Sequence, residues 1–122
     1  MNSSDCKKVL IVEDDPAVRQ TLRDTLEISG YCVYSAADGK SGIEILKSIV
    51  PEPCVVLLDL MMPVMNGWGF LDEMKAYPSL KDIPVVICSA YEESAKAIKP
   101  AAFVPKPVQL ESLLGAVKAF CA

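Results

Sequence analysis

Polar side chains follow the apolar runs of this chain, at the points where buried strands would end. The residues concerned are Glu13, Asp14, Asp59, Ser89 and Lys106. The carboxyl ends of parallel strands meet at one edge of a sheet, so we expect the three acids to converge there. Like charges held that close repel, and a hard cation with oxygen ligands would offset them. The pattern therefore predicts a Mg²⁺ site, with Lys106 neutralising part of the remaining charge.

The same residues favour covalent chemistry at a carboxylate. The chain contains no histidine, which excludes His-based catalytic triads, zinc sites that need imidazole and a role as a phosphohistidine carrier. The predicted site also lacks a Ser or Cys nucleophile with its own base, so Asp59 is the central candidate nucleophile. A carboxylate that attacks a phosphoryl group needs a metal to bridge charge and donors for the phosphoryl oxygens. Mg²⁺, Ser89 and Lys106 would supply that set.

Apolar runs typical of strands alternate with amphipathic segments from one end of the chain to the other. Strands are expected over 8–12, 31–36, 54–58, 84–88 and 102–104. Helices are expected from Asp15-Pro16 to Ser29-Gly30, over 38–50, through 68–74, over about 92–99, and from 105–107 toward the carboxyl end. The pattern is a βα unit repeated five times.

Right-handed βα crossovers of this length predict a doubly wound α/β fold, with five parallel strands in the order 2-1-3-4-5 and helices on both faces. A closed eight-stranded barrel would need about twice the length. With 122 residues, the chain is expected to form one domain.

Charge and hydropathy limit the classes of binding partner that we expect. Twelve basic against sixteen acidic residues give a net charge of −4, so we expect no direct binding to nucleic acid or to anionic membranes. No apolar run approaches the roughly 18 residues that span a bilayer, and Met1 to Lys8 is polar rather than a signal sequence. We expect a soluble, cytoplasmic protein.

The five cysteines are odd in number, scattered, and never paired as C-x-x-C. Three of them, Cys32, Cys54 and Cys88, sit in apolar runs, where a free cysteine behaves as a small hydrophobic residue. We expect all five to be reduced thiols without a redox role.

Four motifs agree in order and spacing with a known family. They are 9–15 (VLIVEDD), 57–63 with Asn66-Gly67 (LLDLMMP and NG), 85–90 (VVICSA) and 103–107 (FVPKP). On these motifs the chain resembles the receiver domain of two-component response regulators over essentially its whole length. The resemblance implies a flavodoxin-like (βα)5 fold, with a single receiver domain over 1–122 and an ordered core over about 7–121.

The resemblance implies a phosphorylation site at the predicted carboxylate cluster. Asp59 would be the phosphoacceptor, and Mg²⁺ would be bound by Asp14, Asp59 and the main-chain carbonyl of Met61, with Glu13 acting through water. The phosphoryl donor would be a histidine on a partner kinase or phosphotransfer protein, and a downstream protein target would read the result.

Three further residues take roles from the resemblance. Ser89 would hold a phosphoryl oxygen and move toward it on activation, and Lys106 would pair with another oxygen. The Lys106-Pro107 peptide is expected to be cis, and Phe103 matches the aromatic switch position. Each residue also has a plainer interpretation: Ser89 as a polar strand end, Lys106 as a solvated lysine, and Phe103 as core packing.

Asp15 is first interpreted as the N-cap of the helix that begins at Pro16, rather than as a functional acid. Bulky side chains at Met61 and Tyr91 predict slow self-dephosphorylation, because an apolar residue does not orient the attacking water.

The chain departs from the family between Ser89 and Lys106, where fewer positions intervene than usual. The missing length falls on the predicted fourth helix, which is therefore short. Residues 99–102 replace the glycine-containing turn that commonly precedes the fifth strand. We expect the face made by this helix and the fifth strand, which partners use in the family, to be altered.

The first hypothesis is a phosphorylation-driven switch that is catalytic only on itself, in phosphotransfer to Asp59 and in autodephosphorylation. The alternative is a receiver-like scaffold that binds partners without being phosphorylated. Enzymes of similar fold fit less well. A haloacid-dehalogenase-type phosphatase needs a second acid where Met61 stands, and a flavodoxin needs a hydroxyl-rich phosphate loop where residues 13–15 are acidic.

Overall fold

The computed structural model describes residues 6–60, 66–90 and 100–121. In these ranges one parallel sheet has the order β2-β1-β3-β4-β5. Its strands are β1 (Lys8–Val12), β2 (Cys32–Ala36), β3 (Val55–Leu58), β4 (Val85–Ser89) and β5 (Ala102–Pro105). This confirms the predicted fold class and strand order.

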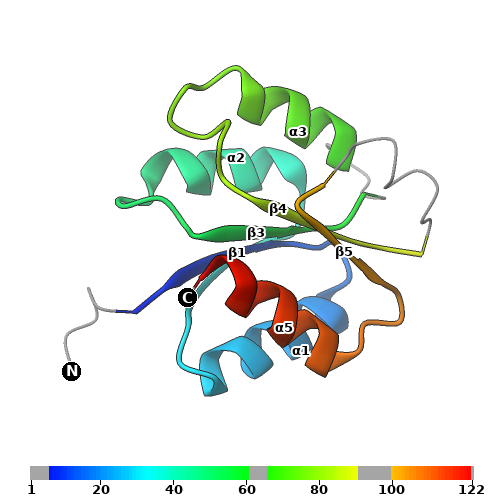
Figure 1. The fold of residues 1–122 in the computed structure, drawn as a ribbon. Helices are drawn as coiled ribbons and strands as arrows, with labels where there is room; N and C mark the ends of the chain where they lie inside the picture. The colour runs from blue at the N-terminus through cyan, green and yellow to red at the C-terminus, as the bar shows by residue number, and fades with distance from the viewer. Residues whose placement is uncertain (1–5, 61–65, 91–99, 122) are drawn as a thin grey trace.

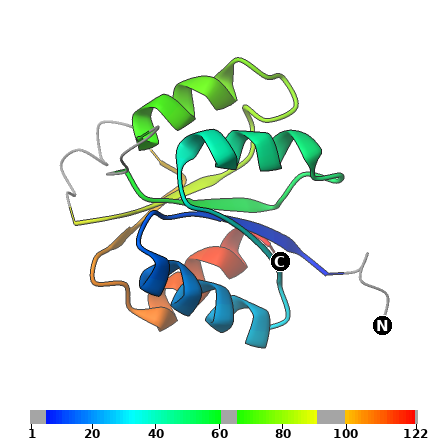
Figure 2. The ribbon, with the colours of Figure 1, turned by 180° about the vertical axis from the view of Figure 1, so that it is seen from behind.

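The helices lie on both faces of the sheet (Figures 1 and 2). One face is covered by α1 (Pro16–Ile28) and α5 (Leu110–Phe120), and the other by α2 (Gly39–Ser48) and α3 (Gly67–Lys75). Each face buries its own hydrophobic layer, because successive strand residues point to opposite sides. Leu57 packs in the α1/α5 layer and Leu58 in the α2/α3 layer. The predicted fourth helix falls outside the described residues.

Helix starts follow their capping residues. The Asp15 carboxylate accepts hydrogen bonds from the main-chain NH groups of Ala17 and Val18, at 2.9 and 3.2 Å. Asp38 and Asn66 cap α2 and α3 in the same manner. After α1, Gly30 has a φ of +98°, in the left-handed region that glycine tolerates. The interpretation of Asp15 as an N-cap is confirmed.

Two boundaries differ from the predictions in ways that matter for the site. β4 continues through Ser89, because the Ser89 carbonyl accepts a hydrogen bond from the Lys106 main-chain NH at 3.0 Å. The last helix begins at Leu110 rather than directly after Pro107. The last residue of β4 is thereby hydrogen-bonded through its backbone to Lys106, the residue that follows β5. The Lys106-Pro107 peptide is cis, as expected.

The prediction that all five cysteines are reduced thiols is wrong. Disulfides join Cys6 to Cys32 and Cys54 to Cys121, with Cα–Cα distances of 5.7 and 5.4 Å, within the usual disulfide range. Only Cys88 is free among the described residues, and it is buried as expected. The paired residues lie 26 and 67 positions apart. The sheet brings them together, which is why their spacing in the sequence gave no sign of it.

Among the described residues, no helix is both long and apolar enough to cross a membrane.

Candidate phosphorylation and metal site

Three carboxylates meet at the carboxyl edge of the sheet. β1 and β3 are neighbours in register, with Val12 opposite Leu58, and the Asp59 NH continues this pairing by donating to the Val12 carbonyl at 3.0 Å. One carboxylate oxygen from each of Glu13, Asp14 and Asp59 lies within 4.8 Å of the others. Oxygen ligands in this arrangement suit a hard divalent cation. The predicted convergence of the acids is therefore observed.

Burial makes the charged form of this cluster unfavourable in free energy unless positive charge lies nearby. Glu13 and Asp59 are only 2% and 6% exposed, and Asp14 is half-buried. Moving charged carboxylates out of water is unfavourable unless they are paired or coordinated.

Lys106 supplies part of that compensation from β5's carboxyl end. Its ammonium nitrogen lies 2.6 Å from Glu13 Oε1 and 3.4 Å from Asp59 Oδ2. One cation thus faces two buried carboxylates, and a third, Asp14, lies beside them. The described part of the site keeps a surplus of negative charge that a bound cation would offset.

The pKa values of the pair reflect this crowding. Burial raises the pKa of Glu13 from 4.5 to about 7, against the opposing effect of the hydrogen bond from Lys106, and the charge of Asp59 raises it further. Burial alone would lower the pKa of Lys106, but the hydrogen bond to Glu13 and the charges of Glu13 and Asp59 raise it above its ordinary value. Lys106 therefore stays charged at neutral pH, whereas Glu13 is poised to gain or lose a proton.

A pocket of about 280 Å³ opens above the cluster. It is lined by the acids, the hydroxyl residue and the lysine that the sequence singled out, together with two neighbours: Glu13, Asp14, Asp15, Asp59, Ser89, Ala90 and Lys106. The acids supply metal ligands, and Ser89 and Lys106 supply donors. This combination can hold a cation and a tetrahedral anion side by side.

Backbone contacts hold the acidic loop in place. Arg19 Nη1 donates to the Glu13 carbonyl at 2.8 Å, and the Asp15 NH donates to Glu13 Oε2 at 3.2 Å. Sequence reasoning missed Arg19. Its signal was a basic residue in the helical turn that follows an acidic strand end.

Gly67 sets the position of Asp59 from the other side. A Cβ at Gly67 would lie 2.7 Å from Leu60 Cα and 3.1 Å from the Asp59 carbonyl oxygen. The Gly67 NH donates to the Leu60 carbonyl at 2.9 Å. The chain after Asp59 therefore packs directly on the start of α3, and only glycine fits this close approach.

The sequence also singled out Phe103, Met61 and Tyr91. Phe103 is half-buried and packs against the α2/α3 layer, opposite Ile87 in the β4–β5 register. Met61, the predicted main-chain ligand, lies outside the described residues, as does Tyr91.

The sequence model of the response regulator receiver domain matches residues 9–118. The chain belongs to the response regulator receiver domain family. This confirms the resemblance seen in the motifs. The receiver domain is 32% identical over 117 residues to the response regulator MprA of Mycolicibacterium vanbaalenii, an alignment that covers 92% of this chain and 49% of that protein.

The chain is also similar to a sensor kinase and to a chemotaxis protein. The sensor kinase CckA of Brucella abortus is 38% identical over 116 residues, which are 90% of this chain but 12% of the kinase. Among solved structures, the chemotaxis protein CheY4 of Vibrio cholerae superimposes with a TM-score of 0.84 at 28% identity, covering 94% of this chain and 98% of that one. This receiver domain thus spans about half the length of MprA and a small part of CckA.

Proposed function

We propose that this receiver domain is a signalling switch that accepts a phosphoryl group on Asp59. The observation that carries the proposal is the placement of Asp59 beside two other acids within 4.8 Å and a lysine at 3.4 Å. A buried carboxylate with a cation site on one side and an ammonium group on the other can attack phosphorus without facing unscreened repulsion.

The donor is proposed to be a phosphohistidine on a kinase or phosphotransfer protein. The similarity to response regulators and to a sensor kinase supports this class of partner. In the reaction, an Asp59 carboxylate oxygen forms a bond to phosphorus while the phosphorus–nitrogen bond breaks, and the histidine leaves with the electron pair of that bond.

Five of the residues that line the pocket have a proposed part in this transfer. Asp14 and Asp59 would bind Mg²⁺ together with the predicted main-chain carbonyl of Met61, and Glu13 would act on the ion through water. The ion would neutralise charge on the phosphoryl oxygens. Ser89 would donate to one phosphoryl oxygen and Lys106 to another, so Lys106 would exchange part of its contact with Glu13 for the phosphoryl group.

We propose that the signal leaves the site through Ser89 and Phe103. Ser89 is 1% exposed and lies in β4, next to the strand that carries Phe103. A shift of Ser89 toward a phosphoryl oxygen would open space beside Phe103, and inward movement of that ring would change the surface that a target protein contacts.

The test is incubation with phosphoramidate, whose phosphorus–nitrogen bond mimics the donor, followed by intact mass. We expect a Mg²⁺-dependent gain of one phosphoryl group that is lost on adding a chelator and absent from Asp59→Asn. Asp72→Asn, an exposed acid on α3, is the matched control and should be phosphorylated normally. A protein that binds Mg²⁺ but never gains the group would instead be the unphosphorylated scaffold.

A further inference from the structure

The edge of the sheet opposite the polar pocket carries both disulfides. Cys6–Cys32 joins the segment before β1 to the start of β2, and Cys54–Cys121 joins the residue before β3 to the residue after α5. The second link is of special interest because β3 leads to Asp59 and α5 follows Lys106. This disulfide connects the beginning of β3 to the end of α5.

The two cysteines of this link differ in exposure. Cys121 is only 6% exposed, whereas Cys54 is half-buried and lines a pocket of about 240 Å³ that also includes Ser79 and Phe120. Cys54 is therefore the more accessible of the two cysteines to a thiol from solution. Exchange at a disulfide begins at the sulfur that the attacking thiolate can approach.

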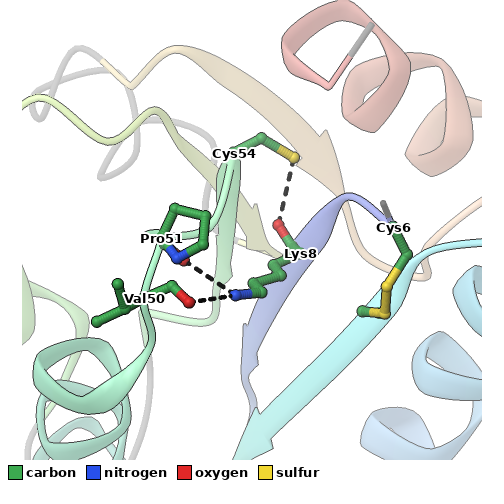
Figure 3. Close-up of a disulfide and its surroundings, with 6 residues drawn as sticks. Cys6, Lys8, Val50, Pro51 and Cys54 are labelled. Atoms are coloured by element: carbon green, nitrogen blue, oxygen red, sulfur yellow. Dashed lines mark hydrogen bonds between the residues drawn. A yellow bond between two sulfur atoms is a disulfide. The ribbon is translucent and has the colours of Figure 1, made fainter. Parts of the chain in front are cut away.

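In the reduced form, the Cys54 thiol would have a hydrogen-bond acceptor next to it. Cys54 Sγ lies 3.2 Å from the main-chain oxygen of Lys8 (Figure 3). Once the disulfide is opened, the Cys54 thiol can donate a hydrogen bond to this oxygen. The reduced side chain thus has a partner without any movement of the backbone.

We propose that Cys54–Cys121 is a thiol–disulfide exchange site, opened by a small thiol at Cys54, and that its reduction releases the end of α5 from the sheet. A thiolate attacks Cys54 Sγ, forming a mixed disulfide and expelling the Cys121 thiolate, which takes a proton. A second thiol then attacks the mixed disulfide. The net reaction converts two small thiols and the protein disulfide into one small disulfide and two protein thiols, so atoms and electrons balance.

The charge of the pocket indicates which thiols it accepts. Glu52 and Asp82 both line it, and no lysine or arginine does so among the described residues. The ammonium group of Lys8 is hydrogen-bonded instead to the Val50 and Pro51 carbonyl oxygens (Figure 3). Two nearby carboxylates repel an anionic reagent, so the site favours a thiol with a cationic group over one with a carboxylate.

Release of α5 is expected to be local. Leu113 and Val117 are fully buried in the α1/α5 layer, and these contacts do not depend on the disulfide. Reduction therefore loosens the last turn of the helix, around Ala119 to Cys121, while the rest stays packed.

The first experiment counts thiols and follows amide exchange in the unphosphorylated protein, so it is independent of the proposed function. After incubation with oxidised glutathione, alkylation under denaturing conditions should modify Cys88 alone; after dithiothreitol it should modify all five cysteines. Reduction should speed amide exchange in the last turn of α5 by about tenfold or more. Five reactive cysteines in the oxidised sample, or equal exchange in both forms, would overturn the proposal.

Paired variants separate the two disulfides. Cys54→Ser/Cys121→Ser should show the fast exchange without reductant, whereas Cys6→Ser/Cys32→Ser should keep the slow exchange and its response to reductant. Should Cys54→Ser/Cys121→Ser fail to fold, the response of Cys6→Ser/Cys32→Ser to reductant still identifies the disulfide, because Cys54–Cys121 is the disulfide that this variant keeps. A response that follows the Cys6 pair instead would contradict the assignment.

The second experiment measures the rate at which Cys54–Cys121 is reduced by cysteamine and by 3-mercaptopropionate, at equal thiolate concentration. We expect the rate with cysteamine divided by the rate with 3-mercaptopropionate to fall by about fivefold in Glu52→Gln/Asp82→Asn, because the repulsion of the anionic reagent is removed. An unchanged ratio would show that the pocket is not the route of entry.

Discussion

The ammonium group of Lys106 lies 2.6 Å from a carboxylate oxygen of Glu13, although 93 positions separate the two residues in the chain. Both groups are also close to Asp59, so the three form one electrostatic unit. A cation bound by the acids would share these carboxylates with Lys106. Competition between the lysine and a metal ion is therefore a built-in property of the site.

This competition predicts opposite effects of Lys106→Met on binding and on chemistry. We expect Mg²⁺ affinity to rise by about tenfold, because a repelling charge is removed. We expect the rate of phosphoryl gain at saturating Mg²⁺ to fall by about a hundredfold, because a donor to the phosphoryl group is lost. Calorimetric titration and intact mass measure the two effects. Lys118→Met, an exposed position in the last turn of α5, is the control and should change neither.

The raised pKa of Glu13 predicts a pH dependence of Mg²⁺ binding. Below its pKa of about 7 Glu13 carries a proton that metal binding must displace. Affinity should therefore rise with pH up to about 7 and level off above it, by at most about tenfold per pH unit. In Glu13→Gln the affinity should be lower but nearly flat from about pH 6 to about pH 8, that is, about one unit on either side of this pKa. An equally steep profile in that variant would assign the proton to another group.

The same shift has a consequence for the metal-free protein. Folding raises the pKa of Glu13, so its stabilising contribution is full below about 4.5 and is lost as pH rises toward about 7. Thermal unfolding in chelator should show stability falling over this window by about 1–3 kcal/mol relative to Glu13→Gln. A rise in stability over the window would contradict the raised pKa.

Gly67→Ala is expected to disturb Asp59 through the backbone. Its Cβ would lie 2.7 Å from Leu60 Cα and 3.1 Å from the Asp59 carbonyl oxygen, which forces the chain after Asp59 to move. We expect a loss of about 1–3 kcal/mol in stability and slower phosphorylation. Gly115→Ala is a matched control, since nothing lies within 4 Å of its Cβ in α5. It should raise stability by about 0.5–1 kcal/mol. Denaturant unfolding checks both.

Asp15 allows its two interpretations to be separated. Asp15→Ala removes the hydrogen bonds to the Ala17 and Val18 NH groups and should cost about 1 kcal/mol. Asp15→Asn keeps a capping oxygen and should recover most of that loss. If Asp15 acts only as a cap, Mg²⁺ affinity in Asp15→Asn stays within about twofold of the unaltered chain, since one exposed charge beside the pocket has little weight in water. A larger drop would mean that its charge serves the metal site.

Local sequence patterns were enough to predict most of the helices and strands. Unbroken apolar runs indicated strands buried on both faces, and Asp15 caps the first helix as predicted. The convergence of Glu13, Asp14 and Asp59 followed from strand order alone, because adjacent parallel strands end side by side.

Contacts between distant segments were not predictable in this way. The partners of Cys6 and Cys54 depend on strand register and on where α5 ends, neither of which leaves a mark on local spacing. Arg19 was missed for a similar reason, since its target is a main-chain oxygen rather than a side chain with a recognisable type. The extension of β4 through Ser89 likewise depends on a hydrogen bond from Lys106, in the loop beyond β5.

The alternation of β3 between the two hydrophobic layers gives a way to observe signalling directly. Leu57 and Leu58 are consecutive, both lie within two positions of Asp59, and each is buried in a different layer. Their methyl groups would give separate nuclear magnetic resonance signals for the α1/α5 side and the α2/α3 side. A change at Asp59 could thus be resolved into the part transmitted to each face, using two adjacent side chains as paired reporters.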